Sequence, residues 1–106
     1  MTTQYDLHLY ETPQEAVHAV ASLITALSAA CIRERGRFTV ALAGGSTPKP
    51  LYELLATPPF ASHIDWKLWH VFWGDERCVP PDHQDSNYRI AAEALLNHVP
   101  VVTSQI

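Results

Sequence analysis

Two stretches of this sequence hold side chains whose types and spacing suit chemistry on an anion. The first, residues 43–49, reads Ala-Gly-Gly-Ser-Thr-Pro-Lys and lies between an apolar run and a helical pattern. The second is the charged triplet Asp75-Glu76-Arg77, which follows a run rich in aromatic residues. Glycines let an anion approach the backbone closely, and a guanidinium binds anionic oxygen in a forked geometry. Together the two stretches indicate a site for a negatively charged ligand.

The glycine stretch has three interpretations. As a phosphate cradle it has a strand, glycines and a helix in the required order, so that free N–H groups at the helix start would face the anion. Ser46 or Thr47 would then cap the helix, Pro48 would take its first position and Lys49 would add a charge. As a nucleophile elbow it has Gly-x-Ser, but Pro48 replaces the last glycine that the sharp turn needs. As a plain turn it needs only one glycine.

The charged triplet has two interpretations. A solvated charge run is the simpler one. However, the triplet directly follows a strand that the sequence predicts to be buried. Arg77 would then bind an anion or stabilise a developing oxyanion, and Asp75 would orient a hydroxyl group or an arginine.

A metal site is not predicted. His63, His70, Cys78, Asp82 and His83 match no closed zinc pattern in their spacing, and the histidine at position 70 lies in the middle of a predicted strand.

Composition excludes several classes of function. The chain has 106 residues, of which 47% are hydrophobic, and a net charge of -4. Without a basic stripe, nucleic acid is not an expected partner. We expect no signal peptide and no apolar run long enough to span a membrane. Cys31 and Cys78 lie in unlike contexts, which favours two reduced thiols and a cytoplasmic protein.

The periodicity predicts an α/β fold in the order β-α-β-α-β-α. The predicted elements are a strand at 5–10, a helix at 12–35, a strand at 38–43, a short helix to 56, a strand at 66–73 and a helix from 86. The long helix carries an apolar stripe of Val17, Val20, Ile24, Leu27 and Cys31. The second and third strands are apolar on both faces, which is typical of a doubly wound, mostly parallel sheet.

This topology places both candidate stretches at one edge. The glycine loop (residues 44–47) and the charged loop (residues 74–85) each leave the carboxyl end of a parallel strand, where open α/β sheets bind ligands. Residues 101–106 resemble the approach to a further strand, so we expect an incomplete sheet belonging to a longer domain. The exposed edge of such a sheet would favour self-association.

The motifs resemble those of 6-phosphogluconolactonases. They are Ala-Gly-Gly-Ser-Thr-Pro at 43–48, Trp-Gly-Asp-Glu-Arg-Cys-Val-Pro at 73–80 and Asp-Ser-Asn-Tyr at 85–88. The resemblance covers essentially the whole chain and the amino-terminal half of that family. The related glucosamine-6-phosphate deaminases share the glycine loop, but typically carry tyrosine where this chain has Arg77.

The resemblance implies hydrolysis of 6-phosphoglucono-δ-lactone to 6-phosphogluconate, in the pentose phosphate pathway and without a cofactor. Gly44, Gly45, Ser46 and Thr47 would hold the sugar phosphate. Asp75 and Arg77 would act at the substrate as catalytic residues.

The family's catalytic histidine lies in a later Gly-x-Gly-x-Asp-Gly-His type motif that this sequence lacks. Residues 1–106 are therefore expected to be the amino-terminal part of one domain, with little or no activity alone. The alternatives are a sugar-phosphate binding module, an inactive fragment, a serine hydrolase using Ser46, or a deaminase-like aldose-ketose isomerase.

Overall fold

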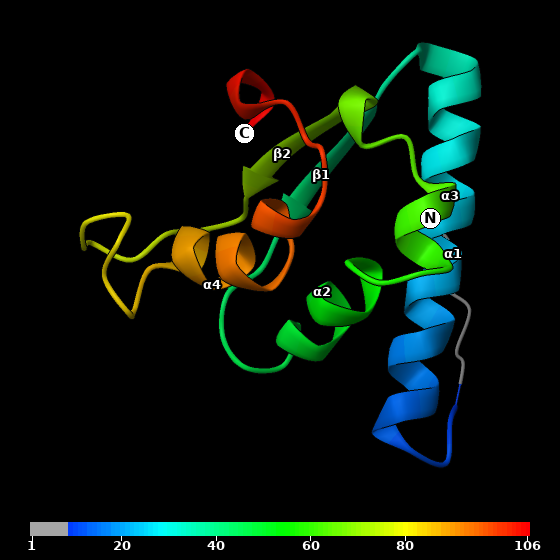
Figure 1. The fold of residues 1–106 in the computed structure, drawn as a ribbon. Helices are drawn as coiled ribbons and strands as arrows, with labels where there is room; N and C mark the ends of the chain where they lie inside the picture. The colour runs from blue at the N-terminus through cyan, green and yellow to red at the C-terminus, as the bar shows by residue number, and fades with distance from the viewer. Residues whose placement is uncertain (1–8) are drawn as a thin grey trace, which may run out of the picture.

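The structure, a computed structural model, describes residues 9–106, and Figure 1 shows its two parallel strands beside a long helix. The helices and strands are α1 (Pro13–Arg35), β1 (Phe38–Leu42), α2 (Lys49–Leu55), α3 (Phe60–His63), β2 (Trp69–Trp73) and α4 (Asn87–Ala94). Short 3-10 turns lie at Trp66–Leu68, Leu96–His98 and Thr103–Gln105.

The ends of α1 follow directly from its sequence. Thr12 caps the helix by accepting a hydrogen bond from the Glu15 N–H at 3.1 Å, and Pro13 follows it. Gly36 ends the helix in the left-handed conformation, with φ 80°. The predicted boundaries of this helix are confirmed.

The apolar stripe predicted for α1 is only partly the face that packs. Ala21 and Ser28 are buried, whereas Val20 and Leu27 are 40% and 47% exposed. The contact face is rotated toward the small residues because they allow close approach to the sheet, where Trp69 Nε1 donates to Ser28 Oγ at 2.8 Å.

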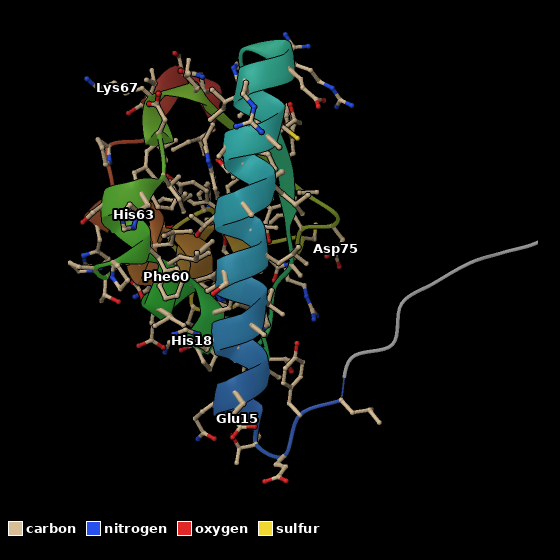
Figure 2. All side chains as sticks on the ribbon, turned by 90° about the vertical axis from the view of Figure 1, so that its right-hand side faces the viewer. Glu15, His18, Phe60, His63, Lys67 and Asp75 are labelled. Carbon is tan, nitrogen blue, oxygen red and sulfur yellow. The ribbon has the colours of Figure 1, made fainter. Side chains whose placement is uncertain are left out.

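Length and composition alone would allow α1 to cross a membrane, because it has 23 residues and contains an 18-residue window with a mean hydropathy of 1.6. The expectation that no stretch qualifies was therefore wrong. Within the described residues, this helix packs on Trp69 and on α3. Figure 2 shows His18 of α1 beside Phe60 of α3, with ring centroids 5.2 Å apart.

The sheet consists of β1 and β2, paired in parallel from Phe38 opposite Trp69 to Leu42 opposite Trp73. This confirms the α/β class with a parallel sheet. The predicted strand at 66–73 begins only at Trp69, because residues 66–68 form a 3-10 turn. The predicted first strand lies largely outside the described residues; at 9 and 10 there is no regular structure.

The helices described cover one face of this sheet. Leu42, Trp69 and Val71 lie in the core cluster that the helices share. On the other face Ala41 is exposed and Phe72 is 56% exposed. The expectation that both strands are covered on both faces is therefore not met within residues 9–106.

The last residues lie against β2 instead of approaching a new strand. The side-chain Nε2 of Gln105, in the turn Thr103–Gln105, donates to the Trp69 carbonyl at 3.2 Å and lies 2.9 Å from His70 Nε2. The strand-like pattern at 101–106 thus forms a turn.

Candidate ligand site at the carboxyl edge of the sheet

Both predicted loops leave the same edge of the sheet. β1 ends at Leu42 and β2 at Trp73, and these two residues are partners in the register. The Gly74 N–H extends the ladder by donating to the Leu42 carbonyl at 3.2 Å. The predicted juxtaposition of the glycine loop and the charged loop is therefore confirmed.

The glycine loop turns without the predicted side-chain cap. α2 begins at Lys49 with Pro48 at the cap position, and no side chain caps it, so the capping role expected of Ser46 or Thr47 was wrong. Gly45 has φ 87°, a backbone conformation that favours glycine, and its surroundings are open. The turn itself therefore needs this one glycine.

Tyr52 fastens the start of the glycine loop to α2. Its hydroxyl donates to the Ala43 carbonyl at 2.6 Å and accepts from the Ala43 N–H at 2.9 Å. Burial raises the pKa of the Tyr52 phenol, an effect that the hydrogen bond with Ala43 partly offsets. The neutral hydroxyl can therefore both donate and accept here.

Glu76 is the best-connected side chain of the charged loop. Its carboxylate accepts from the Arg77 and Asn87 N–H groups at 2.7 Å each, from the Tyr88 N–H at 2.9 Å and from Ser86 Oγ at 3.1 Å. These donors, the Tyr88 and Arg77 N–H groups foremost, lower the pKa of Glu76 from 4.5 to about 2. Glu76 thereby ties the charged loop to the start of α4.

Asn87 joins the two loops. Its side chain is buried at 4% exposure, and its Nδ2 donates to the Asp75 carbonyl at 3.2 Å and to Asp75 Oδ1 at 3.3 Å. The same carboxamide lies against Gly44, where a Cβ would overlap its Oδ1 and Cγ. The φ of Gly44 is not positive, so the backbone conformation does not require a glycine here. The close approach of Asn87 is what requires it.

Sequence reasoning assigned no role to Asn87 or Glu76. The available indication was Ser86, which caps α4 by accepting from the Arg89 N–H at 3.2 Å. A capped helix directly after a charged loop places its first N–H groups within reach of a loop carboxylate.

Arg77 and Ser46 remain available to a ligand. Both residues are exposed, and within residues 9–106 the Arg77 guanidinium makes no ion pair or hydrogen bond with the protein. Asp75 is also exposed and, among the described residues, engages a single side chain, that of Asn87. In the view of Figure 2, Asp75 lies on the opposite side of α1 from Phe60.

A groove of about 680 Å³ runs from the glycine loop between α2 and α4. Its charged and polar lining comes from Ser46, Lys49, Glu53, Thr57, Glu93 and His98. The structure thus divides the predicted site residues. Positions 45 and 46 line the groove, whereas positions 44 and 47 and those of the charged loop lie outside it.

The candidate metal ligands lie apart. In the described part of the chain, no three His, Cys, Asp or Glu side chains come together as a metal site would require. His70 contacts Gln105, and His83 lies 3.8 Å from Asp85.

This fold with its two loops defines a class of protein. The family model "Glucosamine-6-phosphate isomerases/6-phosphogluconolactonase" matches residues 11–106, so the chain belongs to that family.

Within the family, several of the similar proteins are named as lactonases. A protein of Oryza sativa subsp. indica, named "Probable 6-phosphogluconolactonase 4, chloroplastic", is 44% identical over 98 residues, covering 92% of this chain and 30% of that protein. The 6-phosphogluconolactonase of a Nostoc strain is 51% identical over 84 residues, covering 79% and 33%. The solved 6-phosphogluconolactonase of Trypanosoma cruzi matches with a TM-score of 0.80 at 34% identity, covering 94% and 38%. The chain thus spans about a third of the length of these relatives.

Proposed function

We propose that this chain supplies the sugar-phosphate site of a 6-phosphogluconolactonase, which hydrolyses 6-phosphoglucono-δ-lactone to 6-phosphogluconate in the pentose phosphate pathway. The observation that carries the proposal is the joining of the glycine loop to Asp75 by the buried Asn87 side chain. The names of the similar proteins support the lactone as substrate. No cofactor enters this hydrolysis.

The two loops take different parts of the ligand. Gly44, Gly45, Ser46 and Thr47 hold the phosphate through backbone N–H groups and hydroxyls. A local site is needed because the net charge of -4 gives no general attraction for anions. The exposed Arg77 guanidinium, which is free of protein partners within residues 9–106, binds anionic oxygen at the reacting end.

The chemical step requires more than these groups. Lactone hydrolysis needs a base that activates water and donors for the developing oxyanion. Asp75 orients a hydroxyl group of the substrate. Arg77 supplies a positive charge for the developing oxyanion. We propose that residues 1–106 are the amino-terminal part of the domain and that the base comes from the remaining two thirds found in relatives. We propose that this remainder packs on the sheet face around Phe72, which residues 9–106 leave exposed.

Complementation tests this division of the domain. The chain is mixed with the segment of the Nostoc lactonase that it does not match. Lactone hydrolysis is then monitored through the acid that the reaction releases. We expect the mixture to be active and each part alone to show little or no activity. Arg77→Ala should abolish the gain, whereas Arg37→Ala, at an exposed arginine next to the amino-terminal end of β1 and so at the opposite end of the strand from the loops, should not. Full activity of the chain alone, or equal effects of the two substitutions, would contradict the proposal.

Ligand binding tests the phosphate site directly. Titration of the chain with 6-phosphogluconate should shift the amide resonances of residues 44–47. Binding without any reconstituted activity would instead support a sugar-phosphate binding module. Turnover of glucosamine 6-phosphate by the reconstituted protein would support the deaminase-like isomerase, which shares the family.

Two further predictions concern the cellular setting. A cytoplasmic location is our proposal for this chain, although the rice relative is named chloroplastic. Self-association through an edge of the β1–β2 sheet that no further strand of residues 9–106 pairs with is a second proposal, and sedimentation of the purified chain tests it.

A further inference from the structure

Asn87 is a buried polar side chain to which the proposed chemistry assigns no contact with the ligand. It is the first residue of α4, and its side chain is 4% exposed. Its Nδ2 reaches both the carbonyl and the Oδ1 of Asp75, while the rest of the carboxamide fills the space above Gly44. A single side chain therefore contacts both loops of the site.

We propose that Asn87 is a positioning residue that holds the Asp75 carboxylate at a fixed place relative to the glycine loop, so that both loops bind one ligand carrying phosphate and hydroxyl groups. This inference rests on the proposed function, because it takes the glycine loop to be the phosphate site.

The backbone of Asn87 is anchored independently of its side chain. Its N–H donates to Glu76 Oε1 at 2.7 Å, so the Glu76 carboxylate holds the start of α4 in place. The carboxamide then projects from a rigid point. Its position is set before any ligand arrives, and preorganisation of this kind lowers the cost of binding.

The side-chain chemistry required at position 87 is specific. The group must donate to the Asp75 carboxylate and its carbonyl, and it must be small and planar enough to lie on Gly44. Aspartate would have the shape, but it would face Asp75 with a second negative charge. Alanine would leave both loops in place but unlinked.

The first experiment needs no ligand. Asp75→Ala is introduced into the wild-type chain and into Asn87→Ala, and amide chemical shifts are compared. We expect Asp75→Ala to shift the Gly44 and Gly45 amide resonances in the wild-type background and not in the Asn87→Ala background. Absence of the shift in wild type, or an equal shift in both backgrounds, would overturn the role of Asn87. Asn87→Ser serves as a second variant should alanine unfold the chain.

The second experiment compares two ligands on the same variants. Asn87→Ala should weaken 6-phosphogluconate binding about tenfold, the loss expected for one hydrogen bond to a charged group. Inorganic phosphate, which needs only the glycine loop, should keep its affinity within about twofold. The matched control Asn97→Ala, at an exposed asparagine, should change neither.

Each outcome of the second experiment decides one of the two proposals. An equal loss of affinity for both ligands would show a purely structural side chain and overturn the positioning role. If the wild-type chain bound neither ligand, the proposed function would fail, and the ligand-free amide shifts would still decide the role of Asn87.

Discussion

Substitution of Gly44 by alanine separates two reasons why a glycine stands in this loop. Because φ of Gly44 is not positive, the backbone conformation itself accepts alanine. However, a Cβ at this position would overlap Oδ1 and Cγ of Asn87 and lie 2.7 Å from its Nδ2. The Asn87 side chain would have to leave its place, and its hydrogen bonds to Asp75 would break.

The size of the effect follows from these contacts. Loss of the two hydrogen bonds costs about 0.5–1.5 kcal/mol each. Overpacking of a filled site costs about 1–3 kcal/mol, and part of this is relieved when Asn87 moves. We therefore expect Gly44→Ala to lower the free energy of unfolding by about 2–4 kcal/mol.

Urea unfolding of five variants, the Asn87→Ala single variant and the double variant included, measures this cost against matched controls. Gly74→Ala meets no atom within 4 Å and has no positive φ, so it should change the free energy of unfolding by less than about 0.5 kcal/mol. Gly45→Ala also has open space, but its φ of 87° should cost about 1–2 kcal/mol. Removal of the Asn87 side chain should rescue Gly44→Ala by at least about 1 kcal/mol in a double-mutant cycle. If Gly44→Ala cost as little as Gly74→Ala, or cost the same with and without Asn87, the steric explanation would be refuted.

Three other predictions concern the scaffold. Because the pKa of Glu76 is lowered to about 2, its ionised carboxyl should stabilise the fold above about pH 4.5, and this contribution should disappear as the pH falls toward 2; Glu76→Gln should remove that dependence in urea midpoints. Tyr52→Phe should cost about 1–2 kcal/mol, since it removes both hydrogen bonds to Ala43 at the start of the glycine loop, and faster amide exchange of this loop should accompany it. Ser28→Ala should cost about 1–3 kcal/mol by leaving the Trp69 indole N–H buried and unpaired, whereas the exposed Ser22→Ala should be nearly neutral; calorimetric unfolding distinguishes the two.

Local rules accounted for much of the fold. α1 begins after the cap Thr12 and ends at the left-handed Gly36, as predicted. Both signals act through backbone groups of their own neighbours. The order of strands and helices also placed the two loops at one edge correctly. The prediction of the packing face of α1 was wrong. Whether Leu27 or Ser28 faces the sheet depends on Trp69, which is far away in the sequence.

The organisation of the site was less accessible to sequence reasoning. No local pattern shows that Asn87 lies on Gly44, since the two belong to different elements and meet only after the sheet has formed. The cap of α2 was assigned to Ser46 or Thr47 from residue preference, but the helix begins with Pro48 at the cap position and without a side-chain bond. A preference describes what a residue can do, and here the tight turn at Gly45 left these hydroxyls exposed.

Hydrogen bonding sorts the charged side chains of the triplet into different roles. Glu76 accepts four hydrogen bonds, two at each oxygen, and so has little capacity left for a ligand. Asp75 engages one donor through Oδ1, and Arg77 offers an exposed guanidinium without a protein partner in the described part of the chain. Asp75→Asn and Glu76→Gln should therefore affect different properties of the chain, ligand affinity and stability. The first should weaken 6-phosphogluconate binding at unchanged stability, and the second should lower stability first. Equal loss of stability in both variants would contradict this division.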